Sequence, residues 1–390
     1  MTTIDGEVAP GFEPVREAFV ANFTPHGDIG AAVCVYQHGR PVVDLWGGVA
    51  DPETGRPWTR DTLQLVYSAT KGATATAAHM MAERGMLNLD APVARYWPEF
   101  AASGKADIPV RWLLSHQAGL VALDRPLPLA EALSWEPMVA ALAAQRTQWT
   151  PGTAHGYHGR TWGWLVGEVI RRAAGRSTGR FFAEEIARPL GLDFFIGLPE
   201  GERDRVSRMA YRPPAVDLTA VPAESVPEGL REQVAAWRDP NSLSNRAFAV
   251  TNPAAIDFDS PEVQAAELPS SNGIGTARAL ARMYAALIGE VDGVRLLAPE
   301  TLASATKEQA SGKDQVMLIP SRFGTGYMLP MEGNAMTGPQ SFGHTGRGGS
   351  LAFADPQQGI AFGYVMNHIV SGSDDVRAAT LAEAVRKAVG

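Results

Sequence analysis

Apolar and polar positions along the chain follow two different periodicities. Apolar residues at helical spacing between residues 12 and 23 predict an amphipathic helix near the N-terminus. Two apolar runs, 29–36 and 41–46, then flank the polar stretch Gln37-His38-Gly39-Arg40. Apolar runs joined by a short loop that contains glycine predict a β-hairpin.

The middle of the chain has the spacing of helices and few convincing strands. An Ala- and Met-rich run from Ala69 to Arg84, followed by Gly85, predicts one helix with a glycine cap. The segment 203–259 is polar and rich in proline, and we expect it to be irregular and to shape a pocket. Further helices are expected over 110–115, 136–144, 161–174 and 179–190.

The last third of the chain reads as strands between two helices, 277–288 and 375–389. Four short runs separated by Gly, Asp and Pro predict an antiparallel meander over 324–329, 341–344, 350–354 and 360–367. Strands at both ends with helices between them predict an α/β fold of the α+β type, an antiparallel sheet flanked by helices.

This order of elements predicts two domains that share one active site. Residues 1–65 and 260–390 form a discontinuous α/β domain, residues 66–259 form a mostly helical domain, and the site lies in the cleft between them.

Composition narrows the classes of function. The net charge of −8 repels phosphate backbones, so we expect no nucleic-acid partner. No apolar run approaches the roughly 20 residues that span a bilayer, so we expect no membrane association.

The polar, acidic N-terminus does not resemble a secretion signal, which favours the cytoplasm. Cys34 is the only cysteine, so an intrachain disulfide is excluded, and its apolar surroundings predict a buried thiol.

The tetrapeptide Ser68-Ala69-Thr70-Lys71 has the pattern S-x-x-K. A serine in the first turn of a helix has a lysine on the same face one turn later. Serine is a weak nucleophile until a neighbour takes its proton, which a desolvated lysine can do and an arginine cannot. The chain has only five lysines against 29 arginines, which strengthens the interpretation.

The same tetrapeptide occurs a second time, at Ser304-Ala305-Thr306-Lys307. The first copy follows an apolar run and enters the long small-residue helix, whose N–H groups can stabilise an oxyanion. The second copy runs into polar residues and reads as an exposed surface helix. We therefore predict that Ser68 is the nucleophile and that Ser304 is a chance match.

Two later segments supply candidates for proton transfer and substrate binding. Tyr157 precedes a helix that starts near residue 161, and a nearby ammonium is expected to lower its pKa so that it acts as base and acid. His344-Thr345-Gly346 lies on a late strand next to Arg347, and its N–H groups can complete an oxyanion hole. Taken alone, each of these residues favours a structural interpretation, Tyr157 as an aromatic residue at a pocket rim and His344 as a structural histidine.

Other motifs are weaker. Ser350 lies in an incomplete G-x-S-x-G match without a following helix. The eight histidines, His155 and His158 included, form no metal-binding pattern, and His116 reads as a turn residue, so neither a metal nor a cofactor is expected. Gly273-Ile274-Gly275 lacks the third glycine of a dinucleotide fingerprint.

The order S-x-x-K, Tyr157 and H-T-G resembles the serine β-lactamase and penicillin-binding protein superfamily. More narrowly, the chain resembles the class C β-lactamase-like branch that includes the family VIII carboxylesterases. The resemblance also covers Val110–Leu120 and Ser271–Thr276. It implies that Ser68 is acylated, that Lys71 and Tyr157 share proton transfer, and that the N–H groups of Ser68 and Arg347 form the oxyanion hole.

Two departures from the class C pattern favour an esterase. Gly159 stands where Y-x-N has its asparagine, and His344 stands where K-T-G has its lysine. The first change removes an amide that binds a β-lactam side chain, and the second removes a permanent cation facing a substrate carboxylate. We therefore predict a carboxylesterase acting on small, short-chain esters. The alternatives are a β-lactamase or DD-peptidase-like hydrolase, an acyltransferase using the same acyl-enzyme, and a non-catalytic binding or sensor protein.

Overall fold

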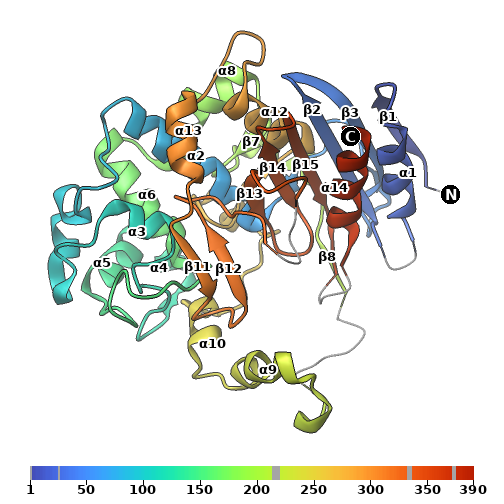
Figure 1. Ribbon diagram of the computed structural model, residues 1–390. Coiled ribbons are helices and arrows are strands. Elements are labelled where there is room, and N and C mark those ends of the chain that lie inside the picture. The colour runs from blue at the N-terminus through green and yellow to red at the C-terminus, as the bar shows by residue number, and fades with distance from the viewer. Residues whose placement is uncertain (1, 25–26, 213–219, 332–335, 371–374) are drawn as a thin grey trace.

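An antiparallel sheet built from both ends of the chain forms one layer of the computed structural model (Figure 1). The structure describes residues 2–24, 27–212, 220–331, 336–370 and 375–390. The strands lie in the order β1-β3-β2-β15-β14-β13, with β4 beside β3, and every pair is antiparallel. Their bounds are β1 Ile4–Val8, β2 Gly30–Gln37, β3 Arg40–Asp51, β4 Arg56–Pro57, β13 Phe342–Thr345, β14 Leu351–Asp355 and β15 Ile360–Met366.

The two faces of the sheet bury alternate residues of each strand. Val33 and Val35 of β2 point into one core, and Cys34 and Tyr36 point into the other. The first core is covered by α1 (Glu13–Ala21) and α14 (Arg377–Ala388), which pack on each other, and the second by α12 (Ala277–Ile288). The predicted antiparallel sheet flanked by helices is confirmed, as are the hairpin, the terminal helices and the buried thiol.

Helices fill the opposite half of the molecule (Figure 1). The predicted small-residue helix forms α2 (Thr70–Glu83), which is buried from Thr70 to Met81 because its small side chains let neighbouring elements approach closely. α6 (Thr161–Ala174) and α7 (Thr178–Phe182) pack against α2, and the same half also contains α3 Val110–Leu114, α4 Leu129–Leu133, α5 Glu136–Ala144 and α8 Arg188–Leu190. The division into two domains at residues 65 and 260 stays a prediction.

Three details differ from the predictions. The polar segment Ile4–Val8 forms an edge strand, where only alternate positions need to be apolar. The segment 203–259 contains two helices, α9 (Arg231–Arg238) and α10 (Leu243–Phe248), although residues 213–219 within it lie outside the described part. The strand expected over 324–329 is wrong: the strand is β12 (Pro320–Phe323), paired with β11 (Ala310–Lys313).

Glycine explains the missing strand. Gly326 adopts a φ of 93°, which breaks the extended conformation. A Cβ atom at this position would lie 2.6 Å from the Cβ of Ala75, so the turn packs directly against α2. The turn at Gly326 therefore packs on the helix that carries Lys71, and the segment pairs with β13 only through a single bridge between Met328 and Gly343.

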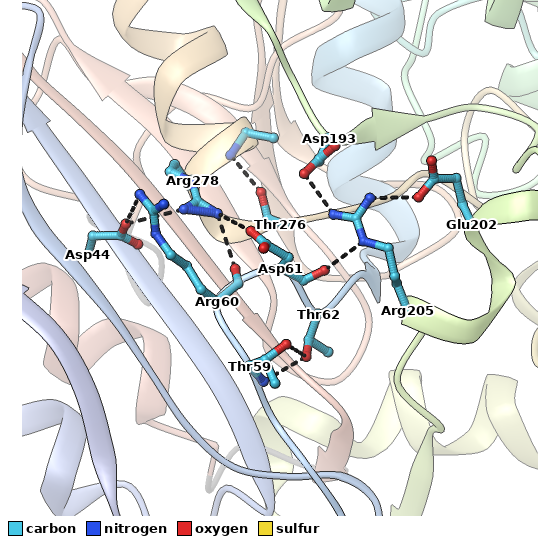
Figure 2. A network of polar contacts seen from close by, with 11 residues as sticks. Asp44, Thr59, Arg60, Asp61, Thr62, Asp193, Glu202, Arg205, Thr276 and Arg278 are labelled. Atoms are coloured by element: carbon cyan, nitrogen blue, oxygen red, sulfur yellow. Dashed lines mark hydrogen bonds and ion pairs between the residues drawn. The ribbon is translucent and has the colours of Figure 1, made fainter.

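A network of ion pairs fixes the loop that leads to Ser68 (Figure 2). The Asp61 carboxylate lies 3.3 Å from Arg278 at the start of α12, and its backbone carbonyl accepts from Arg205 at 3.1 Å. Arg205 also pairs with Asp193 at 2.7 Å. Exposed pairs of this kind contribute at most about 1 kcal/mol each. Their main effect is to hold the loop that precedes β5 (Gln64–Leu65). This strand ends three residues before Ser68, the predicted nucleophile.

No helix in the described ranges has the length and apolar character needed to cross a bilayer.

Candidate active site

Ser68 and Lys71 lie at the junction of a short turn and a helix. Ser68 belongs to the 3₁₀ turn η1 (Tyr67–Ala69), which continues directly into α2 (Thr70–Glu83). Residues three apart share one face of such a turn. The Nζ atom of Lys71 lies 3.3 Å from the Ser68 hydroxyl oxygen.

The surroundings of Lys71 favour its neutral form. The side chain is fully buried, and Nζ donates to the carbonyl oxygens of Gly159 at 3.1 Å and Ser270 at 3.0 Å. Burial, with a contribution from the positive charge of Arg160, lowers the pKa of Lys71 well below its usual range. A neutral amine has two N–H groups and one lone pair. Two carbonyls take the N–H groups, so the lone pair faces the Ser68 hydroxyl.

Tyr157 is the third predicted residue that the fold brings to Ser68. The Lys71 Nζ atom lies 4.9 Å from the centre of the Tyr157 ring. A hydrogen bond with the Ser68 hydroxyl acts to lower the pKa of Tyr157. Burial nevertheless raises the pKa of Tyr157, and the nearby Asp314 charge raises it further. The prediction of a lowered tyrosine pKa is therefore wrong, because desolvation outweighs the effect of its neighbours.

Two residues that the sequence did not single out as functional hold the Tyr157 loop. Asp314 is buried, and its Oδ1 accepts the backbone N–H of Tyr157 at 3.0 Å. His116 adopts a φ of 63°, as a turn residue does, and its Nδ1 accepts the N–H of His158 at 3.1 Å. Asp314 lies 157 positions from Tyr157 in a polar loop without a motif, so no local pattern could have indicated it.

His155 and His158 have structural partners. His158 bonds the Gly156 carbonyl through Nδ1 at 2.7 Å and accepts the Leu120 N–H through Nε2 at 3.0 Å. His155 bonds the Ser321 hydroxyl at 2.9 Å. Within the ranges that the structure describes, no group of three His, Cys, Asp or Glu residues is arranged to bind a metal.

The turn between β13 and β14 lies beside the nucleophile. The N–H of Gly346 donates to the Ser350 carbonyl at 2.7 Å, and the Ser350 hydroxyl donates to the carbonyl of Val66 at 2.9 Å. Among the described residues, the backbone N–H groups of Ser68 and Arg347 have no protein acceptor. Two free N–H groups near a serine hydroxyl can bind the negative oxygen of a tetrahedral intermediate.

His344 is buried on β13 and uncharged. Its Nδ1 lies 2.7 Å from the Thr345 carbonyl oxygen, so Nδ1 carries the proton and Nε2 is the acceptor. Burial, with the nearby Lys71, lowers the pKa of His344 to about 3. Its ring centre lies 6.0 Å from that of Tyr157. A neutral imidazole therefore stands where the K-T-G motif would place a charged lysine, as the sequence predicts.

The competing serines lie in different surroundings. Ser304 and Lys307 are exposed at the end of α13 (Pro299–Thr306), as predicted for a chance match. Ser350 is buried, and its hydroxyl donates a hydrogen bond to the Val66 carbonyl. Gly273 binds the Val66 N–H through its carbonyl at 2.9 Å, which makes it part of the framework around Ser68 and not a nucleotide loop.

Comparison with known proteins places this arrangement in a family. Residues 19–387 match the family model described as Beta-lactamase. The chain is 38% identical over 379 residues to "Esterase/beta-lactamase LipL" of Mycobacterium tuberculosis (strain ATCC 25618 / H37Rv), covering 94% of this chain and 83% of that protein.

Two solved structures cover nearly the whole chain. A family VIII carboxylesterase is 37% identical with a TM-score of 0.83, covering 99% of this chain and 100% of its own. A penicillin-binding protein homologue from Caulobacter crescentus is also 37% identical, with a TM-score of 0.86 and the same coverage. The chain therefore belongs to the β-lactamase family, in the branch that contains the family VIII carboxylesterases.

Proposed function

We propose that this protein is a carboxylesterase that hydrolyses small, uncharged esters through an acyl-enzyme on Ser68. The observation that carries the proposal is the contact between Ser68 and a buried Lys71 whose two other partners are carbonyl oxygens. In this arrangement the neutral form of Lys71 directs its lone pair at the nucleophile, and burial favours that form.

In the first half of the reaction, Lys71 removes the Ser68 proton as the serine oxygen attacks the ester carbonyl. The N–H groups of Ser68 and Arg347 bind the oxyanion. Tyr157 stays protonated because its pKa is raised, so its hydroxyl is suited to donating a proton to the departing alkoxide. Lys71 then passes the proton that it took from Ser68 to Tyr157. Water attacks the acyl-enzyme by the same route, and the acid leaves.

The surroundings of the nucleophile favour an uncharged substrate. His344 is neutral and supplies no cation for a substrate carboxylate. A Cβ atom at Gly159 would lie 2.5 Å from the ring of Phe248, so an aromatic side chain of α10 fills the space of the missing asparagine. An apolar wall in this position suits an acyl or alkyl group better than a polar side chain.

Side-by-side turnover of esters and a chromogenic cephalosporin tests this function. We expect rapid hydrolysis of p-nitrophenyl acetate and butyrate, slower hydrolysis of the octanoate, and little cephalosporin turnover. Cephalosporin turnover at a rate comparable to that of the esters would support the β-lactamase alternative. Ester product in place of free acid, when an alcohol is added, would support the acyltransferase alternative.

The charge of Arg160 is expected to set the lower pH limit of activity. Its positive charge lowers the pKa of Lys71, so Arg160→Gln raises that pKa and leaves Lys71 protonated up to a higher pH. The acid limb of the kcat/KM profile with p-nitrophenyl butyrate therefore moves to higher pH. Arg180→Gln, a change at an exposed residue, leaves the limb in place. A limb that stays still or moves to lower pH in Arg160→Gln would contradict this role.

Gly346 is expected to tolerate no side chain. A Cβ atom there would lie 2.0 Å from the Ser350 hydroxyl and 2.2 Å from the Val66 carbonyl oxygen. Gly346→Ala therefore pushes the turn with Arg347 away from Ser68, and kcat for p-nitrophenyl butyrate falls by about 100-fold or more. Gly201→Ala, where a Cβ atom meets nothing within 4 Å, keeps full activity. Unchanged kcat in a folded Gly346→Ala variant would show that this turn takes no part.

A further inference from the structure

A buried arginine contacts the turn between β13 and β14, which carries Arg347. Arg377, the first residue of α14, is 5% exposed. Its Nη2 donates to the Gly348 carbonyl at 2.8 Å, one residue beyond Arg347, and to the His368 carbonyl at 3.0 Å. One guanidinium thus links the turn after β13, the strand β16 (His368–Val370) and α14.

Resting on the function proposed above, we propose that Arg377 is a positioning residue for the oxyanion hole: through the Gly348 carbonyl it fixes the turn that carries the Arg347 N–H.

Two carboxylates fix the orientation of the guanidinium. Asp375 accepts from Nε and Nη2, both at 2.8 Å, and Asp28 accepts from Nη1 at 2.7 Å. The Tyr364 hydroxyl lies 2.7 and 2.8 Å from the two Asp28 oxygens. A forked pair with a carboxylate holds the plane of the guanidinium as well as its position. One of the two Nη2 N–H groups points at Asp375, so the other is shared between the Gly348 and His368 carbonyls and has a set direction.

Inside the turn, the backbone hydrogen bonds Gly346 N–H to Ser350 carbonyl and Gly349 N–H to Gly346 carbonyl do not involve Arg347 or Gly348. Gly348 and Gly349 adopt φ values of 82° and 117°, which glycine reaches easily and also leaves easily. A Cβ atom at Gly349 would lie 2.7 Å from Asp375 Oδ2 and 3.1 Å from Arg377 Nη2, so glycine is what allows the cluster to approach.

The turn is thus held from two sides. Ser350 ties it to Val66, next to the nucleophile, and Arg377 ties it to the far side of the sheet. With only the Ser350 contact, the Arg347 N–H can rotate away from the oxyanion. Because an oxyanion donor acts on the transition state and not on bound substrate, loss of the Arg377 contact should affect kcat more than KM.

The test compares Arg377→Lys and Arg377→Met with Arg386→Met, a matched change at an exposed ion pair on the same helix. For p-nitrophenyl butyrate we expect kcat to fall roughly 10- to 100-fold in Arg377→Met with KM nearly unchanged, and less in Arg377→Lys. The affinity for an alkyl boronic acid, whose adduct places an oxygen in the oxyanion hole, should fall in parallel. Arg386→Met should match the wild type.

Folding is checked by circular dichroism and thermal unfolding, and if Arg377→Met does not fold, Arg377→Lys decides. A folded variant with wild-type kcat and boronate affinity overturns the proposal. So does a loss that appears only in KM. Failure of the proposed function looks different, because wild-type protein would then turn over no ester or Ser68→Ala would retain activity.

Discussion

Replacing Ser68 with alanine is expected to reduce kcat for p-nitrophenyl butyrate by about 10⁴-fold or more. Removing the nucleophile of a serine hydrolase leaves only the contributions of the oxyanion hole and of substrate binding. The fold should be unaffected, because the half-buried Ser68 side chain has Lys71 as its main partner and that residue keeps two carbonyl acceptors. Steady-state release of nitrophenol from p-nitrophenyl butyrate, normalised to the amount of folded protein, measures the effect.

The second S-x-x-K copy provides a matched control. Ser304→Ala removes the same atom from the same tetrapeptide in an exposed helix, and it should leave kcat and KM unchanged. Ester turnover that survives in Ser68→Ala, or that is lost in Ser304→Ala, would mean that the nucleophile is assigned wrongly.

Replacing Lys71 with arginine is expected to reduce kcat by about 10³-fold, although both side chains are long and basic. Arginine stays protonated at any pH at which the protein is folded, so it cannot take the Ser68 proton. It also brings a larger group into a fully buried site between the Gly159 and Ser270 carbonyls. Lys71→Met removes the base without adding charge and should lose as much activity.

Lys313→Arg, at an exposed residue that pairs with Glu232, is the matched control and should behave as the wild type. Single-turnover nitrophenol release separates acylation from later steps. Acylation at the wild-type rate in both Lys71 variants would make Tyr157 the general base, against the raised pKa of that residue.

The parts of the fold that were predicted correctly are those with a strong local pattern. The helix over 161–174 was predicted with the bounds that the structure has, because its apolar positions repeat at helical spacing and Gly175 ends it. The hairpin of β2 and β3 was indicated by two apolar runs around Gly39. The strand β1 was missed because its exposed face is polar, and 324–329 was misread because Gly326 turns the chain.

The candidate site divides in the same way. Ser68 and Lys71 are three residues apart, so helical geometry alone predicts their contact. The groups that tune them come from distant parts of the chain. The Ser270 carbonyl lies 199 positions from Lys71, and Arg377 lies 29 positions beyond Gly348. Such contacts depend on tertiary packing, which leaves no periodic pattern in the sequence.

The pKa of Tyr157 shows a further limit of the sequence. A neighbouring lysine predicts a lowered value only if that lysine is charged and the ring is hydrated. Both conditions depend on burial, and here the buried Lys71 favours its neutral form while desolvation raises the tyrosine pKa.

The central claim is an acyl group carried by Ser68, and mass spectrometry of quenched enzyme tests it most directly. Wild-type protein is mixed with p-nitrophenyl butyrate, quenched in acid during turnover and digested, and the peptides that contain Ser68 and Ser304 are compared. We expect a butyryl group on the Ser68 peptide, absent in Ser68→Ala, and an unmodified Ser304 peptide. A butyryl group on any other residue of an enzyme that is turning over ester, with Ser68 unmodified, would contradict it.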